Sequence, residues 1–256
     1  EGQLRRLGLK NDKAFTCTCY MDEVGNVPAR GQVLSWSESS AVVYANSVLG
    51  ARCNRNSAYM DIFGAILGRV PYFGLLTDEG RRASWVVEVK TSKRPEAQVL
   101  GSAIGLKVME DVPYIKGLAP FLGGQLDDSA KAYLKDMGAA SASNGAVGLY
   151  HVEGLTPEAV DLGDALIRPG AKTYVIDDAE LERVKAGYPV IWKNPDAKPK
   201  LCFIGCPHLS LSQLIGWTEK LEGALQGGRL KIKTVLTAAP DVLEAFRKTP
   251  YFERLR

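Results

Sequence analysis

The sequence predicts an α/β fold in which helices form layers over units of parallel β-sheet. Strand-like runs alternate with helical runs along most of the chain, which is the pattern of this class. The second half then closes with the order strand, turn, helix, strand, turn, helix across residues 201–248. The apolar strands of this last unit are typical of a buried parallel pair.

The same patterns place the individual elements. The small apolar run AVVYANSVLGA follows Ser39, a residue type that favours helix starts, and Pro71 ends the apolar run at 57–68. Gly227 and Gly228 end the first helix of the closing unit. In chain order, we expect helices near 39–50, 57–68, 94–109, 127–139, 178–186, 210–225 and 240–248. We expect strands near 83–90, 145–150, 171–176, 201–205 and 231–236.

Length and composition are those of an ordinary globular protein. The 256 residues are 46% apolar and 24% charged, and the net charge is +3. Lysine and arginine are scattered among acidic residues, which excludes a nucleic-acid stripe or a basic membrane helix. No apolar run approaches the length of a membrane span, and the first residues lack a signal pattern. We therefore expect a cytoplasmic protein without a nucleic-acid or membrane partner.

One stretch predicts a boundary between two regions. Residues 187–200, GYPVIWKNPDAKPK, are rich in proline and lysine and are typical of a surface connection. We expect a first region at 1–190 and a βαβα unit at 191–256. Arg81 and Arg82 lie in the turn-rich segment GRVPYFGLLTDEGRR, and we expect both to be solvated.

The helix expected at 39–50 carries an unusual polar stripe. Ser39 and Asn46 are seven residues apart, as are Ser40 and Ser47, so each pair points to the same side two turns on. Any one of these side chains is explained by backbone hydrogen bonds or close helix packing. Four such side chains together are unfavourable in a protein core, because each unpaired buried polar group costs about 1–3 kcal/mol. The stripe therefore predicts a bound polar ligand.

The five cysteines indicate reduced thiols or metal ligands, because an odd number without regular spacing is not a disulfide framework. Cys17 and Cys19 lie in FTCTCY, and Cys53 lies in ARCNR. Cys202 falls in the middle of an expected strand, where an inert core thiol is typical. Cys206 lies in the expected turn GCPHLS, at the carboxyl end of that strand, where open α/β sheets usually bind ligands.

Several kinds of site compete for these thiols. Zinc is weakly supported because no pair of Cys-x-x-Cys motifs is present. An iron–sulfur cluster needs only three or four thiolates that converge in space. Cys206 with His208 also suggests a thiol hydrolase, although a nucleophile and its base are brought together by the fold rather than by adjacency. No glycine-rich phosphate loop is present.

The motifs together resemble a known family. SESSAVVYANSVLGARCNR, followed by GRVPYFGL and later by FIGCPHLSL, is similar to the large-subunit catalytic domain of aconitase X. These iron–sulfur hydro-lyases include cis-3-hydroxy-L-proline dehydratases and archaeal phosphomevalonate dehydratases. The resemblance runs from about Cys17 to the end of the chain. It implies an aconitase-like layered α/β/α fold and makes residues 1–190 the catalytic region with the polar substrate helix.

The resemblance also implies roles for individual residues. Cys17 and Cys206 become iron–sulfur ligands, and the stripe and the residues after it become the lining of the substrate site: Ser39, Ser40, Asn46, Ser47, Arg52, Asn54 and Arg55. Cys19 and Cys53 gain no support, since family members usually have proline at the position of Cys19 and often have threonine at that of Cys53. Glu38 is a possible base, although a charge or cap at a helix start explains it more simply. His208 is a further catalytic candidate.

The resemblance finally implies a function and a partner. Dehydration of a β-hydroxy acid needs a cation for the carboxylate, donors for developing charge and a Lewis acid for the leaving oxygen. Family members carry further segments and a small swivelling domain or subunit, so we expect a partial catalytic unit that is inactive alone. We expect cis-3-hydroxy-L-proline as substrate, because Arg52 and Arg55 suffice for one carboxylate; phosphomevalonate is the alternative. A non-catalytic α/β binding or subunit-interaction module is the hypothesis from another class.

Overall fold

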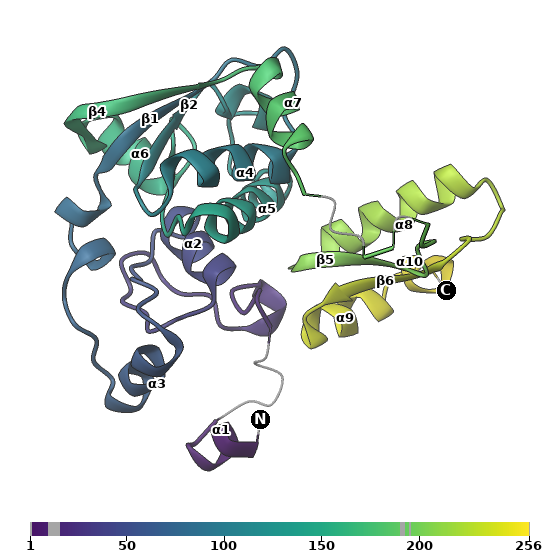
Figure 1. Cartoon of the computed structure of the whole chain (residues 1–256). Helices are drawn as coiled ribbons and strands as arrows, with labels where there is room; N and C mark the ends of the chain where they lie inside the picture. The colour runs from purple at the N-terminus through teal and green to yellow at the C-terminus, as the bar shows by residue number, and fades with distance from the viewer. Residues whose placement is uncertain (1, 10–15, 190–192, 195, 256) are drawn as a thin grey trace. The chain divides into compact units, whose positions relative to one another are not determined.

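The computed structural model describes residues 2–9, 16–189, 193–194 and 196–255. The chain divides into two compact units (Figure 1). The larger unit comprises residues 28–193, and the smaller unit combines residues 1–27 with residues 194–256. The boundary that the sequence predicts between 190 and 191 lies outside the described residues. The N-terminal segment belongs to the same unit as the closing βαβα region.

The larger unit is built around a four-stranded, wholly parallel sheet with the strand order β3-β2-β1-β4. Its strands are β1 (Ala83–Val89), β2 (Pro113–Lys116), β3 (His151–Val152) and β4 (Ile167–Ile176). The sequence ASWVVEV places apolar or small residues at every second position of β1, and these residues are buried. Along the chain, β2 and then β3 are added on one side of β1, and β4 is added on its other side. The strand order therefore reverses between β1 and β4.

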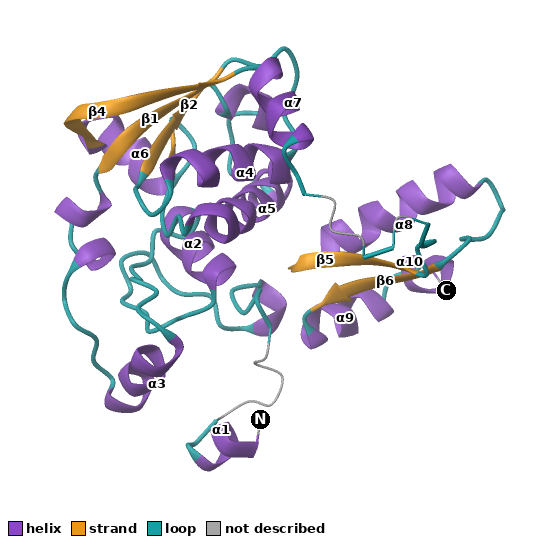
Figure 2. Cartoon of the chain, viewed as in Figure 1, coloured by secondary structure: helices purple, strands orange, loops and turns teal. Residues whose placement is uncertain are grey.

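Helices α4 (Ala97–Val108) and α5 (Asp128–Gly145) pack against each other and lie between the sheet and α2 (Ser39–Ser47) (Figure 2). Glycines allow the close approach of α4 and α5. A β-carbon at Gly101 would lie 2.2 Å from the Met137 carbonyl oxygen, and one at Gly145 would lie 1.9 Å from the Gly105 carbonyl oxygen. Neither contact is possible for a real side chain, so this helix pair requires glycine.

Shorter elements complete the larger unit. They are the helices α3 (Ala58–Leu67), α6 (Pro157–Leu162) and α7 (Asp178–Ala186), and the 3-10 turns η3 (Gly74–Leu76), η4 (Glu79–Arg81), η5 (Ala119–Leu122) and η6 (Gly163–Leu166). Gly68 ends α3 in the left-handed conformation with a φ of 66°. Asp177 caps α7 by accepting a hydrogen bond from the Glu180 N–H.

The smaller unit contains the parallel pair β5 (Leu201–Leu209) and β6 (Lys233–Ala238) with helices α8 (Leu211–Leu225), α9 (Pro240–Arg247) and α10 (Tyr251–Leu255). It also contains α1 (Gly2–Arg6) and the turn η2 (Asp22–Val24). Its core is formed by Leu209, Leu214, Val242 and Phe246. Met21 and Val24 pack on this core, which explains why the N-terminal segment belongs to this unit.

The expected α/β class with parallel-sheet units is confirmed, but several elements differ from the prediction. Helix α5 continues to Gly145, so the strand expected at 145–150 is wrong, and only His151–Val152 pair with β2. The expected turn after 205 is also wrong, because β5 continues to Leu209 through an irregularity that contains a cis Cys206–Pro207 bond. Elements α1, β2, α6 and α10 were not predicted. Within the described residues, no helix is long and apolar enough to cross a membrane.

Candidate functional site

Helix α2 starts at a carboxylate rather than at a serine. The N-cap is Glu38, whose Oε2 accepts hydrogen bonds of 2.7 Å from the Ala41 N–H and from the Ser40 hydroxyl. Ser39 donates a longer bond of 3.4 Å to the other carboxylate oxygen. Glu38 therefore binds a main-chain N–H at the helix start, which is the simpler of the two roles expected for it.

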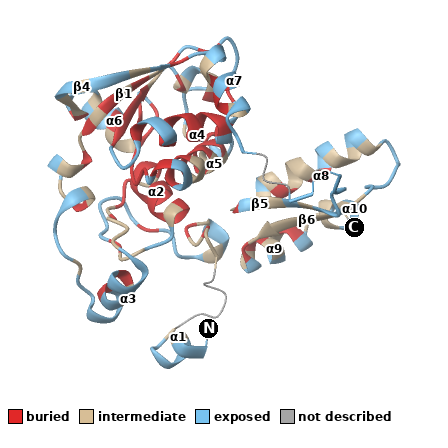
Figure 3. Cartoon of the chain, in the orientation of Figure 1, coloured by how far each residue is buried: buried red, intermediate tan, exposed pale blue. Residues whose placement is uncertain are grey.

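The polar stripe of α2 is largely buried and already has partners within the protein (Figure 3). The Asn46 amide nitrogen donates to the carbonyl oxygens of Cys53 and Gly148, both at 2.8 Å, and its oxygen accepts the Cys53 N–H at 2.9 Å. The Ser47 hydroxyl accepts the Tyr150 N–H at 2.9 Å. The inference that Asn46 and Ser47 need a ligand for hydrogen-bond partners is therefore wrong. Among the four stripe residues, Ser39 is the one that is not buried.

Two side chains of the segment 52–55 connect it to the loop at 73–78. Arg52 donates to the Leu76 carbonyl oxygen at 2.7 Å and pairs with Asp78. Asn54 accepts the Leu75 N–H at 2.6 Å and donates to the Phe73 carbonyl oxygen at 2.8 Å. These contacts give Arg52 and Asn54 a structural role in joining the two segments, whatever else they contact.

Arg55 differs from Arg52. Its guanidinium makes one long bond of 3.4 Å to the Ala146 carbonyl oxygen and has no carboxylate partner among the described residues. Its backbone has a φ of 52°, a left-handed conformation that is unfavourable for an arginine. Such conformations persist where surrounding contacts hold them and are common at functional sites. Arg55 is thus the arginine of this segment that is available to a ligand.

Arg81 is buried, and the expectation that it is solvated is wrong. Its side chain is 1% exposed and forms an ion pair of 2.7 Å with Glu158. It also donates to the Asn46 side-chain and main-chain oxygens and to the Leu75 carbonyl oxygen, at 3.0–3.2 Å. His151 Nε2 lies 2.8 Å from the Arg81 carbonyl oxygen, and burial lowers the pKa of His151. No local sequence signal marks Arg81, because its partners lie far away in the chain.

In the smaller unit, Cys17 lies against the GCPH segment of β5. The His208 N–H donates to Cys17 Sγ at 3.2 Å, and His208 Nδ1 lies 2.8 Å from the Thr16 hydroxyl. Cys206, two residues from His208, is exposed. Cys17 is 191 residues from His208 in the sequence, yet Cys17, Cys206 and His208 belong to one part of the fold. The other candidate residues, from Glu38 to Arg55, belong to the larger unit.

The remaining cysteines are placed differently. Cys53 is fully buried, its thiol interacts with the main chain of Trp36, and burial raises its pKa. These are the properties of a structural thiol rather than a ligand. Cys202 lies within β5, as expected, but it is half-buried rather than part of the core. Among the described residues, no three cysteine, histidine, aspartate or glutamate side chains are arranged as a metal site.

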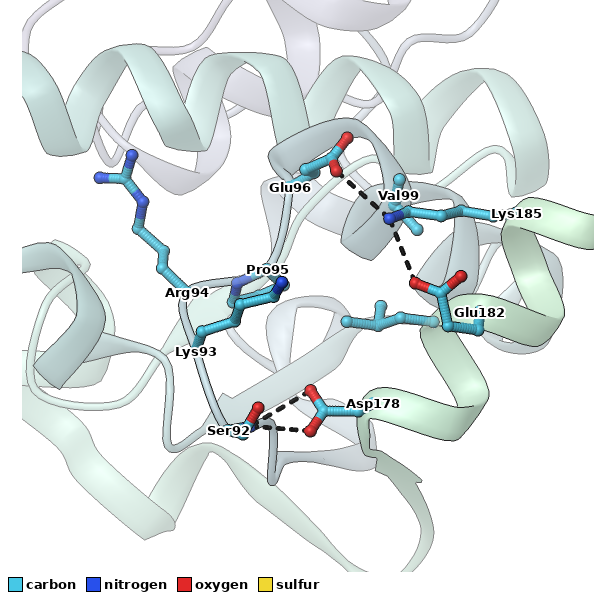
Figure 4. A pocket seen from close by; sticks show the side chains of 10 residues that line it. Ser92, Lys93, Arg94, Pro95, Glu96, Val99, Asp178, Glu182 and Lys185 are labelled. Atoms are coloured by element: carbon cyan, nitrogen blue, oxygen red, sulfur yellow. Dashed lines mark hydrogen bonds and ion pairs between the residues drawn. The ribbon is translucent and has the colours of Figure 1, made fainter.

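A separate cavity of about 320 Å³ lies at the carboxyl ends of β1 and β4, and none of the predicted site residues lines it (Figure 4). Lys185 bridges Glu96 and Glu182, and Asp178 accepts the Ser92 N–H. The formal charges of the side chains that line the cavity cancel: Lys93, Arg94 and Lys185 are basic, and Glu96, Asp178 and Glu182 are acidic. This balance gives the cavity no charge with which to select an ion.

Two family models match the chain: the aconitase X first domain over residues 2–79 and the aconitase X second domain over residues 83–186. The chain belongs to the aconitase X family. The resemblance seen in the sequence motifs is thereby confirmed. The first domain contains α2 and the segment 52–55, while the second contains the parallel sheet with α4 and α5. Arg81 lies between the two matched segments.

Individual members of the aconitase X family are similar over most of the chain. The phosphomevalonate dehydratase large subunit of Thermococcus kodakarensis is 37% identical over 240 residues, which are 93% of this chain and 56% of that protein. The corresponding subunit of Methanothermobacter thermautotrophicus is 39% identical over 79% of this chain and 47% of its own length. The cis-3-hydroxy-L-proline dehydratase of Hypocrea jecorina is 34% identical over 78% of this chain and 33% of its own length.

A solved structure of the family has the same fold. The crystal structure of Thermococcus kodakaraensis aconitase X in its holo-form matches with a TM-score of 0.83 at 34% identity, covering 99% of this chain and 60% of that one. The chain thus spans about half the length of the curated relatives that it matches. Activity, substrate and partners of the whole enzyme are therefore matters for proposal.

Proposed function

We propose that this chain forms part of the large subunit of an aconitase X-type dehydratase, a hydro-lyase that removes water from a small β-hydroxy carboxylate. Family membership supports the reaction class. The observation that carries the proposal is the contact between Cys17 and the main chain of His208, next to Cys206. It brings two thiol-bearing segments from opposite ends of the chain into one part of the fold.

An iron–sulfur cluster is the cofactor that fits these residues. Thiolates are its usual ligands, and hydrogen bonds from N–H groups to sulfur, like that from His208 to Cys17, tune such clusters. Cys17 and Cys206 would hold it, as two of the three or four ligands required. The remaining one or two ligands would come from outside the described residues, since no group of three cysteine, histidine, aspartate or glutamate side chains within them could hold a metal ion. When bound, the cluster would supply the Lewis acid for the leaving hydroxyl.

Arg55 is the residue that we assign to the substrate carboxylate. A guanidinium holds a carboxylate through two parallel hydrogen bonds and stabilises the charge that develops when the adjacent carbon loses its proton. Arg52 is less suited to this task because each of its two terminal nitrogens already has a partner, the Leu76 carbonyl oxygen for one and Asp78 for the other. Ser39, which is partly exposed at the start of α2, would donate a hydrogen bond to the same substrate.

The buried residues of the stripe would act by holding the site. Asn46 and Ser47 fix the main chain around α2, Ser40 binds the Glu38 carboxylate, and Asn54 fixes the neighbouring loop. Glu38 and His208 are the candidates for proton transfer. We favour His208, because Glu38 already accepts the Ala41 N–H and the Ser40 hydroxyl as a helix cap.

Two substrates are supported by different observations. Phosphomevalonate is supported by the identities of 37% and 39% to large subunits that are named for it, against 34% to a cis-3-hydroxy-L-proline dehydratase. We therefore place phosphomevalonate first, in contrast to the preference from the sequence motifs. cis-3-Hydroxy-L-proline stays the second candidate because Arg55 alone provides for one carboxylate and not for a phosphate as well. A small subunit is the expected partner, since relatives are named large subunits.

An anaerobic assay of the full-length iron-reconstituted enzyme, with its small subunit, tests the proposal. We expect a brown protein that converts one of the two compounds to its dehydrated product, detected by mass spectrometry as the loss of one water. A colourless protein that binds a compound without converting it would favour the non-catalytic module. Turnover that is independent of iron but sensitive to thiol alkylation would favour the cysteine hydrolase.

A further inference from the structure

We propose that Arg81 is a positioning residue for the dehydration, because it holds the segment 52–55 in the conformation that directs Arg55 toward the substrate. The proposal rests on the carboxylate-binding role assigned to Arg55 above. Arg81 is buried in the larger unit, with 1% of its side chain exposed. A buried arginine is uncommon, and such a residue is normally tied to specific partners.

Arg81 uses each of its three nitrogens. Nε donates to Glu158 at 2.7 Å, and Nη2 donates to the Asn46 carbonyl oxygen at 3.1 Å. Nη1 donates both to the Asn46 side-chain oxygen at 3.2 Å and to the Leu75 carbonyl oxygen at 3.0 Å. Lysine cannot reproduce this pattern, since its ammonium is a single compact charge without the planar fork.

These partners come from both matched family domains. Asn46 and Leu75 lie within residues 2–79, and Glu158 lies within residues 83–186, while Arg81 lies in the gap between the two matches. One guanidinium therefore joins α2 and the loop at 73–78 of the first domain to α6 of the second. Arg55 lies at the same junction, because its long hydrogen bond is to the Ala146 carbonyl oxygen of the second domain.

Two short routes lead from Arg81 to Arg55. Along the first, Arg81 orients the Asn46 amide, which binds both the N–H and the carbonyl group of Cys53. Along the second, Arg81 holds the Leu75 carbonyl oxygen, while the N–H of the same residue is held by Asn54. Cys53 and Asn54 are the two residues immediately before Arg55.

The backbone of Arg55 needs such support. With a φ of 52°, Arg55 lies in a region where a side chain other than glycine or asparagine is disfavoured. Hydrogen bonds on the two preceding residues support this conformation, and two of the partners in these bonds, Asn46 and Leu75, are themselves bound by Arg81. Loosening them would let Arg55 relax and would move the guanidinium away from the carboxylate.

The test is a double-mutant cycle in the full-length enzyme with its small subunit. We would measure kcat and KM for wild type, Arg55→Lys, Arg81→Lys and the double variant. Arg81→Lys keeps a positive charge beside Glu158 but loses the fork, so we expect KM to rise about tenfold with kcat reduced less than threefold. Arg82→Lys is the matched control, because Arg82 is the neighbouring arginine and its bonds, to Glu79 and the Ile167 carbonyl oxygen, are 3.4 Å long. We expect the control to behave as wild type.

The coupling between the Arg81 and Arg55 substitutions tests the proposal. If Arg81 acts through Arg55, the double variant resembles Arg55→Lys alone, because the guanidinium that Arg81 positions is already absent. Multiplicative effects, or normal KM in Arg81→Lys beside an impaired Arg55→Lys, would overturn the positioning role and leave the proposed function intact. Normal kinetics in Arg55→Lys would instead overturn the carboxylate assignment. If Arg81→Lys does not fold, Glu158→Gln replaces it in the same cycle, and multiplicative effects there would overturn the proposal.

Discussion

The side-chain amide of Asn46 forms a reciprocal pair with the main chain of Cys53, accepting its N–H at 2.9 Å and donating to its carbonyl oxygen at 2.8 Å. In this way a helix side chain supplies the hydrogen bonds that a neighbouring strand would otherwise make. The pair is buried and fixes the chain two residues before Arg55. It explains why a helix made largely of apolar residues contains an asparagine.

We predict that the hydrogen bonds of Asn46 contribute strongly to stability. Asn46→Ala would leave the N–H and carbonyl groups of Cys53 and the Gly148 carbonyl group without a buried partner. We expect the free energy of unfolding in urea to fall by about 3 kcal/mol. Asn144→Ala is the control, because Asn144 is exposed, and its effect should stay below about 1 kcal/mol. Equal effects of the two substitutions would contradict the account.

Iron content should separate the cysteines into two groups. Cys17→Ala and Cys206→Ala should lower the iron content and the visible absorption of the anaerobically purified enzyme, because their thiolates are assigned to the cluster. Cys53→Ala and Cys202→Ala should keep both signals, since Cys53 is a buried structural thiol and Cys202 lies in the regular part of β5 that pairs with β6, before the irregularity that contains Cys206. Iron loss from Cys202→Ala that matches the loss from Cys206→Ala would refute the assignment.

Glu38 can be tested as a cap against its possible role as a base. Glu38→Ala removes the acceptor for the Ala41 N–H, so we expect the unfolding free energy to fall by about 1 kcal/mol. Glu38→Asn restores a good capping residue without a titratable carboxylate. We expect this variant to recover stability and to keep most of the activity. A stable Glu38→Asn enzyme with no turnover would show that the carboxylate takes part in the reaction.

The buried His151 side chain should make the free energy of unfolding depend on pH. Burial lowers its pKa below the ordinary 6.5, so the folded protein holds it neutral while the unfolded chain binds a proton below pH 6.5. The part of the unfolding free energy that depends on His151 being neutral is fully present above pH 6.5. It is lost as the pH falls through the lowered pKa. His151→Gln should therefore lose less unfolding free energy between pH 7 and pH 5 than the wild type does. An unchanged pH dependence in His151→Gln would rule out this cause.

The α/β class and most helices could be predicted from local patterns, but lengths and partners depended on the rest of the fold. The segment after residue 139 continues as helix because Gly145 permits contact with Gly105 of α4. The alanines in this run favour helix, whereas its serines, asparagine and glycine do not, so the run itself does not fix where the helix ends. Likewise, β5 continues through the cis Cys206–Pro207 bond because it pairs again with β6 at Leu209.

The candidate site shows the same limit. The polar stripe was a correct sign that α2 is not a simple core helix, yet its partners are Cys53, Gly148 and Tyr150 rather than a ligand. Two of these partners lie about a hundred residues away in the sequence, so spacing alone could not reveal them. Arg81 was missed for the same reason, because Glu158 is distant and GRR is an ordinary surface motif.

The most direct test of the central claim, that Arg55 binds the carboxylate of a dehydratase substrate, is to compare Arg55→Lys with Arg52→Lys in the full-length, iron-loaded enzyme. The measurement is kcat/KM for the compound that wild type dehydrates. We predict a loss of about 100-fold for Arg55→Lys, because lysine cannot form the two parallel hydrogen bonds, and less than about threefold for Arg52→Lys. Normal kcat/KM in Arg55→Lys, or a larger loss in Arg52→Lys, would contradict the account.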